Sequence, residues 1–159
     1  MDQTPTASPT PVARPAGAVE AVPAADPQAA LAHFRAKLAF ETDPADLHAD
    51  LAAGVGGLVV VDGRRPGGYA EAHLPGAVNL PHATIDAATT ADLDPAALYV
   101  TYCWGPACNA STRTAANLAA LGFRVKELIG GLSAWQAEGF PVEGSRAGEG
   151  PVSEVGCAC

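Results

Sequence analysis

The chain has 159 residues, with 17 acidic against 9 basic side chains and a formal net charge of −8. This length suggests one domain, and without a Lys/Arg cluster the acidic chain is not expected to bind nucleic acid. No apolar run is long enough to span a membrane, and the N-terminus lacks the basic start and apolar stretch of a secretory signal. We therefore expect a cytoplasmic protein whose thiols stay reduced.

The two ends of the chain differ in composition from the middle. Residues 1–26 are rich in Pro, Ala and Thr and hold few large apolar side chains, so we expect a disordered tail. Residues 144–159 return to a Gly-rich, weakly apolar composition and end in Cys-Ala-Cys, which predicts a flexible C-terminal tail. The predicted folded domain covers residues 27–143.

The domain is expected to begin with two helices. Leu31, Phe34 and Leu38 recur at helical spacing in the first, which starts near Pro27. Asp43 and Pro44 suit the cap and first turn of the second helix. Leu47 and Leu51 would supply its buried face, and Gly54 can end it.

Strands and helices alternate through the rest of the domain. Residues 58–62 predict a fully buried strand, 77–80 a short strand, 98–102 a third strand, and 123–128 a fourth. A helix is expected over residues 109–121, and a last helix carries Leu132 and Trp135. This alternation predicts an α/β fold with a central, mostly parallel sheet flanked by helices.

Cys103 is the residue whose position points most directly to chemistry. It follows the strand over residues 98–102 and precedes a helix, the place where open α/β sheets bind ligands. The free N–H groups of a helix N-terminus favour a thiolate, which is the nucleophilic form of cysteine, and they form a cradle for anions. The alternative interpretation is a buried and inert cysteine.

Two stretches of the sequence carry a family resemblance. Residues 62–77 resemble the N-terminal signature of rhodanese domains, in which an Asp-x-Arg ends a strand and a Tyr-x-x-x-His-Leu-Pro-Gly-Ala run follows. Residues 102–125 and 130–142 match the second half of the family pattern, which includes Tyr-Cys, Leu-Gly-Phe, Gly-Gly-Leu and Trp. The resemblance covers about residues 30–143 and implies a three-layer rhodanese-like fold.

The resemblance also implies a sulfurtransferase reaction. Cys103 would take sulfane sulfur from thiosulfate or a persulfide and pass it to cyanide, a small thiol or a thiol protein, with no cofactor and no metal. Asp62, Arg64 and His73 would have structural roles, and Trp135 and Phe140 are expected in the core. The persulfide would be held by the backbone of the loop residues Trp104, Gly105, Pro106, Ala107, Cys108 and Asn109.

This chain departs from the family pattern in its loop. Many rhodanese loops carry an Arg five positions after the cysteine, where this chain has Cys108. Thiosulfate is a dianion, so losing this cation weakens the case for it as donor, and Arg113 is the nearest replacement. Rhodanese-fold phosphatases use a Cys-x5-Arg loop, and Asn109 at the Arg position argues against a phosphatase.

The remaining cysteines leave alternatives open. Cys108 could resolve an oxidised Cys103 as a disulfide or simply pack at the helix start. Cys157 and Cys159 could receive sulfur from Cys103 or bind a soft metal, although two ligands fall short of a closed site. The competing functions are therefore a thiol–disulfide or oxidant-responsive protein that uses Cys103 and Cys108, and a non-catalytic rhodanese-like binding module.

Overall fold

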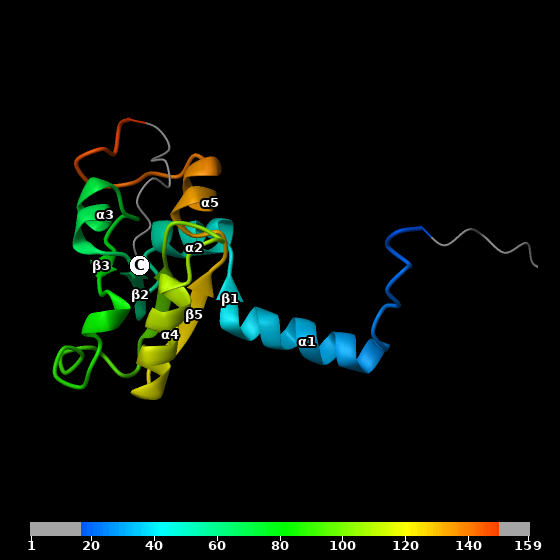
Figure 1. The fold of residues 1–159 in the computed structure, drawn as a ribbon. Coiled ribbons are helices and arrows are strands. Elements are labelled where there is room, and N and C mark those ends of the chain that lie inside the picture. The colour runs from blue at the N-terminus through cyan, green and yellow to red at the C-terminus, as the bar shows by residue number, and fades with distance from the viewer. Residues whose placement is uncertain (1–16, 150–159) are drawn as a thin grey trace, which may run out of the picture. The chain divides into compact units, whose positions relative to one another are not determined.

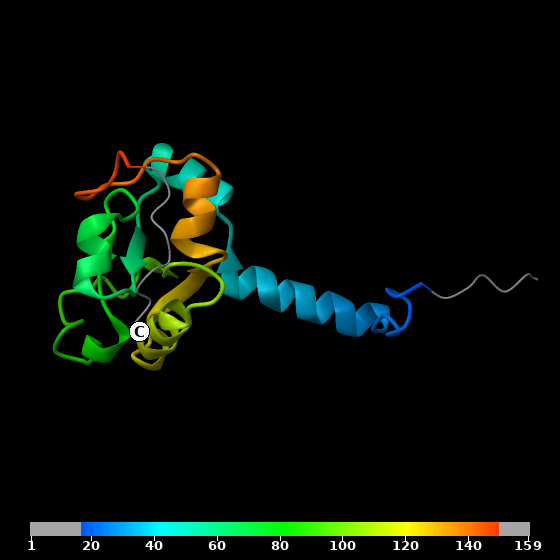
Figure 2. The same cartoon turned by 45° about the horizontal axis from the view of Figure 1, so that its top comes forward.

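The structure is a computed structural model that describes residues 17–149 (Figures 1 and 2). Chain contacts divide the protein into two compact units, residues 1–34 and 35–159. The elements are, in chain order, α1 (Pro27–Phe40), β1 (Glu41–Thr42), α2 (Pro44–Ala52), β2 (Leu58–Asp62), α3 (Pro66–Glu71), β3 (Val78–Asn79), the 3-10 helix His82–Thr84, β4 (Leu98–Tyr102), α4 (Ala110–Ala120), β5 (Arg124–Leu128) and α5 (Gly131–Ala137).

The strands form one five-stranded sheet in the order β1-β5-β4-β2-β3. Every pairing in it is parallel, as expected where helices connect the strands. The carboxyl ends of the strands therefore gather at one edge of the sheet, which is where β4 delivers Tyr102 and Cys103.

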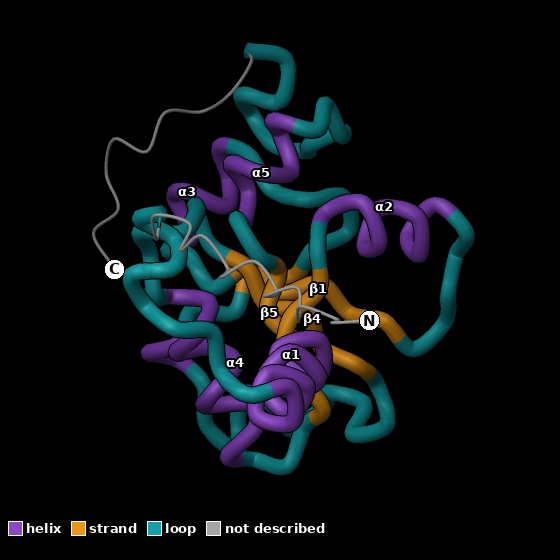
Figure 3. Tube along the Cα trace, turned by 90° about the vertical axis from the view of Figure 1, so that its right-hand side faces the viewer, coloured by secondary structure: helices purple, strands orange, loops and turns teal. Residues whose placement is uncertain are grey.

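Side chains of the central strands alternate between two cores. Val60, Val100 and Tyr102 pack on one face with Leu132 and Trp135 of α5. Val61 and Tyr99 pack on the other face with Leu118 of α4. Successive strand residues point to opposite faces, so both faces need helical cover, and Figure 3 shows the strands as the middle layer. The predicted three-layer α/β fold is confirmed.

The predicted elements largely match the structure, with specific differences. Asp43 caps α2 as expected, because its Oδ1 accepts from the Asp46 N–H at 2.9 Å. Residues 66–71 form a helix, α3, that was not predicted, because Gly67 and Gly68 disfavour a helix in this stretch. The two-residue strand β1 was not predicted either. The helix over residues 27–40 is present, yet none of its side chains is buried.

The described part of the C-terminal segment contacts the domain through its backbone. His73 and Glu143 exchange two N–H···O bonds of 2.8 Å, and the N–H groups of Ser145 and Arg146 donate to Ala70 and Glu71 at 3.0 and 2.9 Å. Residues 1–16, and the terminal pair Cys157 and Cys159, lie outside the described residues. Between residues 17 and 149 no helix is long and apolar enough to cross a membrane.

Candidate active site

Cys103 begins the loop that joins β4 to α4, and the amino end of α5 holds this loop in place. The N–H of Leu132 donates to the Cys103 carbonyl and that of Ser133 to the Trp104 carbonyl, both at 2.9 Å. Gly131 lies close to the Cys103 backbone, and a Cβ atom at position 131 would come within 2.4 Å of the Cys103 carbonyl oxygen. The free N–H groups of α5 are thus used to fix the backbone that carries the thiol.

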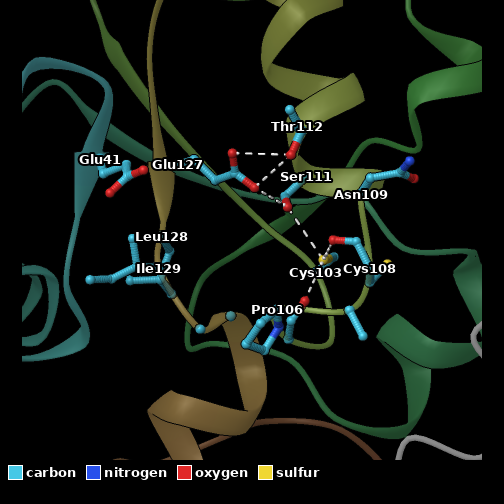
Figure 4. A pocket seen from close by; sticks show the side chains of 14 residues that line it. Glu41, Cys103, Pro106, Cys108, Asn109, Ser111, Thr112, Glu127, Leu128 and Ile129 are labelled. Atoms are coloured by element: carbon cyan, nitrogen blue, oxygen red, sulfur yellow. Dashed lines mark hydrogen bonds between the residues drawn. The ribbon is translucent and has the colours of Figure 1, made fainter. Parts of the chain in front are cut away.

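A pocket of about 750 Å³ lies in front of Cys103 (Figure 4). It is lined by Cys103 and the predicted loop residues Gly105, Pro106, Ala107, Cys108 and Asn109. Ser111 and Thr112 of α4, Glu41, and residues 127–131, which join the end of β5 to the start of α5, complete the lining. Trp104 is not among the lining residues. Its ring instead lies over the Arg64 guanidinium, 4.2 Å from the ring centroid.

The Cys103 sulfur is buried and has polar neighbours on several sides. Its thiol donates to the carbonyl of Cys108 at 3.0 Å and lies 3.7 Å from that of Gly105. The Ser111 hydroxyl lies 3.3 Å from the sulfur. Two carbonyl oxygens near the sulfur suit a protonated thiol, whereas a hydroxyl donor suits a thiolate.

The pKa of Cys103 is raised, chiefly because burial penalises the charged thiolate. Hydrogen bonds from the side chain and backbone of Ser111 lower this pKa in part, and the neighbouring Cys108 raises it further. The first turn of α4 thus lowers the pKa of Cys103 through Ser111, but burial outweighs these hydrogen bonds and the net shift is upward.

Two carboxylates, Glu127 and Glu41, supply the charge of the pocket. The Ser111 hydroxyl lies 2.5 Å from Glu127 Oε1, and Thr112 donates to the same oxygen at 3.0 Å. Glu41 pairs with the half-exposed Lys37 at 3.4 Å. No Lys, Arg or His is among the residues that line the pocket, and Arg113 is exposed outside it.

Sequence reasoning missed Ser111 and Glu127. Their link depends on α4 crossing beside β5, which no local pattern reveals. The available signal was the position of Glu127 near the carboxyl end of a strand predicted next to the Cys103 strand. Among the described residues, no group of three or more His, Cys, Asp or Glu side chains could hold a metal ion.

Asp62 and Arg64 lie behind the site and form a buried network. Their side chains are 0 % and 2 % exposed and pair at 2.6 Å. Tyr102 donates its hydroxyl proton to Asp62 at 2.7 Å, and Arg64 also donates to the Ala72 carbonyl. Ala72 belongs to the first motif and Tyr102 to the second, so the network joins the two halves of the domain. His73 stacks on Tyr69 and bonds its carbonyl.

Comparison with known proteins agrees with this fold. The model of the rhodanese-like domain family matches residues 43–138. The BH2092 protein of Bacillus halodurans is 47 % identical, with 76 % of this chain and 88 % of that chain covered and a TM-score of 0.74. A Lactobacillus plantarum protein is 29 % identical over 73 % and 98 % of the two chains, with a TM-score of 0.63.

The chain therefore belongs to the rhodanese-like domain family, a family that includes sulfurtransferases. It is also similar to a thiosulfate sulfurtransferase of Pseudomonas aeruginosa, at 31 % identity, a TM-score of 0.56, and coverage of 69 % of this chain but 20 % of that one. The search of curated proteins finds no match.

Proposed function

We propose that this protein is a sulfurtransferase that carries sulfane sulfur as a persulfide on Cys103. The observation that carries the proposal is the position of Cys103, which directly follows a central strand, lines a pocket of about 750 Å³ and has its backbone fixed by the amino end of α5. A buried structural cysteine has no need of a polar pocket or of a loop held in this way.

The reaction has two balanced halves. The Cys103 thiolate attacks the outer sulfur of a donor R–S–SH, so that a new S–S bond forms as the donor S–S bond breaks. The departing R–S⁻ takes a proton and leaves as R–SH, while Cys103 holds the persulfide. A thiol or cyanide acceptor then takes the outer sulfur and returns the Cys103 thiolate. A reducing compartment such as the cytoplasm keeps this thiol available.

The charge of the pocket favours an organic persulfide over thiosulfate as donor. Glu127 and Glu41 face the space in which the donor must lie, and a dianion beside carboxylates is repelled. An Arg introduced at position 108 should improve the use of thiosulfate, because a charged hydrogen bond contributes about 1.5–3 kcal/mol. Steady-state kinetics with both donors tests this, and a strong native preference for thiosulfate would contradict it.

Mass spectrometry after brief incubation with a thiol persulfide tests the proposed function. We expect one added sulfur on the peptide that contains Cys103, and transfer of that sulfur to cyanide. Cys103→Ser should abolish both while leaving the fold intact, whereas Cys108→Ser serves as the matched control and should keep both. Transfer by Cys103→Ser at the wild-type rate would remove this residue from the mechanism, and no loading at all would favour a binding module.

A second candidate function is a thiol–disulfide or oxidant response through Cys103 and Cys108. The observation that favours it is that the two buried cysteines interact, so that Cys108 contributes to the raised pKa of Cys103. Peroxide would oxidise one thiol to a sulfenic acid, and the other would displace water to form the disulfide. Peptide mapping without reductant should then show the Cys103–Cys108 disulfide. A sulfenic or sulfinic acid on Cys103 alone would count against this candidate.

A further inference from the structure

The Ser111 hydroxyl lies between two acceptors and has only one proton to give. Its Oγ is 2.5 Å from Glu127 Oε1 and 3.3 Å from Cys103 Sγ, as the dashed lines of Figure 4 show. The shorter contact is to a carboxylate, which is the stronger acceptor of the two. While Glu127 is ionised, its hydrogen bond therefore competes with Cys103 for the hydroxyl proton of Ser111.

Glu127 has hydroxyl partners but no cationic partner among the ion pairs of residues 17–149. None of the described residues that line the pocket is a Lys, Arg or His. Glu41 stands beside Glu127 as its partner in the parallel β1–β5 pairing, so both carboxylates lie on one side of the sheet. Lys37 pairs with Glu41, which leaves Glu127 as the carboxylate that a ligand can neutralise.

We propose that Glu127 selects a sulfur donor with a positively charged group and, through Ser111, couples the binding of that group to the activation of Cys103. Glu127 is then a specificity-determining residue and Ser111 a positioning residue. The donor class is a small organic persulfide with an ammonium group, such as the persulfide of an aminothiol. This inference deepens the proposed function and rests on it.

The coupling follows from the hydrogen bonds on each side of Ser111. An ammonium group that pairs with Glu127 weakens the hold of this carboxylate on the Ser111 hydroxyl. The hydroxyl then turns its proton to Cys103 Sγ, and the thiol proton leaves to solvent. The thiolate attacks the outer persulfide sulfur, the donor S–S bond breaks, and the aminothiol leaves after taking up one proton. One proton is released and one consumed, so the loading step is balanced.

The thiol titration of Cys103 tests the coupling without any sulfur transfer. Glu127→Gln removes the competing charge, and its amide can donate to Ser111, so the pKa of Cys103 should fall by about one unit. Glu41→Gln is the matched control. It also removes a carboxylate from the pocket, but this carboxylate has no hydrogen bond to Ser111, so the titration of Cys103 should stay unchanged. The pKa is measured from thiolate absorbance in a background in which Cys108, Cys157 and Cys159 are replaced by Ser, so that Cys103 is the single thiol.

A double-mutant cycle separates the hydrogen bond from general charge effects. Ser111→Ala alone should raise the pKa of Cys103, and adding Glu127→Gln to it should then change little. If Glu127→Gln lowers the pKa equally with and without Ser111, the effect acts through space and the proposed coupling is overturned. An unchanged pKa in Glu127→Gln overturns it as well.

Donor selectivity tests the substrate class. The persulfides of cysteamine and of 3-mercaptopropionate have similar size and opposite charge. Wild-type Cys103 should load faster from the cationic donor by about tenfold, the ratio that about 1.4 kcal/mol produces. Glu127→Gln should remove most of this preference. Equal loading rates with the two donors in the wild type would refute the substrate class. Loading by neither donor would instead refute the sulfurtransferase function. In that case the titration of Cys103 would still decide whether Glu127 and Cys103 are coupled.

Discussion

Burial and hydrogen bonding act in opposite directions on the Cys103 thiol. Burial raises its pKa, and the hydroxyl and backbone N–H of Ser111 lower it only in part. A raised pKa is expected to slow the reaction of Cys103 with oxidants and alkylating reagents, because both react with the thiolate. For the proposed sulfur carrier, a slow resting thiol would be an advantage, because its reactivity would then depend on the donor that enters the pocket.

The raised pKa of Cys103 predicts a pH dependence of its reactivity. Below a thiol pKa the thiolate fraction grows tenfold for each pH unit, and a higher pKa shifts this rise to more alkaline pH. Alkylation by the neutral reagent iodoacetamide should therefore keep accelerating beyond the pH at which a free cysteine levels off. Rates measured from pH 6 to 11 in a background with Cys108, Cys157 and Cys159 replaced by Ser test this. A plateau near neutral pH would contradict the buried, protonated thiol.

The buried Asp62–Arg64 pair predicts a large loss of stability when it is broken. Asp62→Asn leaves Arg64 charged in a dry environment and should lower the free energy of unfolding by about 3–5 kcal/mol. Lys37→Met breaks the more exposed pair with Glu41 and should cost below about 1 kcal/mol. Urea unfolding measures both variants. Equal losses of unfolding free energy in the two variants would show that burial of the Asp62–Arg64 pair adds nothing to the cost of breaking it.

The sequence was informative about single residues where their role is local. Asp43 could be assigned as a cap, and Asp62 and Arg64 as structural residues, because strand ends and helix starts have recognisable chemistry. The state of Cys103 could not be predicted, because it depends on burial by segments distant in the chain. The same holds for Trp104, whose ring packs on Arg64 and not in the pocket.

At the scale of elements, the site depends on the junction between β5 and α5. Gly130 and Gly131 both have positive φ, of 74° and 54°, and turn the chain so that α5 begins against the Cys103 loop. The Gly-Gly pair was recognisable in the sequence as a turn, but its contact with the loop was not. No element was predicted for the Gly67-Gly68 pair, which lies in α3, where a Cβ on Gly68 would lie 3.2 Å from the Trp104 ring.

Gly131→Ala should displace the Cys103 loop and impair sulfur loading. The added Cβ would come within 2.4 Å of the Cys103 carbonyl oxygen, and the backbone must yield. Gly139→Ala is a matched control, because Gly139 also has positive φ, 76°, but nothing lies within 4 Å of its Cβ position. The control should lose about 1–2 kcal/mol of stability from backbone strain and keep its rate of loading. Loading by Gly131→Ala at the control rate would contradict the role of this junction.

At the scale of the molecule, the sheet brings the two sequence motifs together. The β2–β4 pairing aligns Asp62 with Tyr102, one residue before Cys103, so the first motif supports the backbone that carries this cysteine. The fold class could be predicted because alternating strands and helices with short links leave few parallel arrangements. The strand order, and hence the neighbours of Cys103, required the structure.

Truncation from the C-terminus should reveal where the stable domain ends. A chain that stops at Glu149 keeps the backbone bonds from Ser145 and Arg146 to the end of α3, whereas a chain that stops at Glu143 loses both. Each net hydrogen bond contributes about 0.5–1.5 kcal/mol, so the shorter chain should be less stable by about 1–3 kcal/mol. Both truncations remove Cys157 and Cys159, so the two variants differ only in the segment 144–149.

Urea unfolding of the two truncations and the full chain gives the comparison. The chain ending at Glu149 should match the full chain in stability, and loading of Cys103 should stay unchanged if Cys157 and Cys159 play no part in it. The chain ending at Glu143 should unfold at lower urea with a similar slope, because the core up to Val142 remains. Equal midpoints for both truncations would show that the bonds of residues 144–146 to α3 do not stabilise the domain.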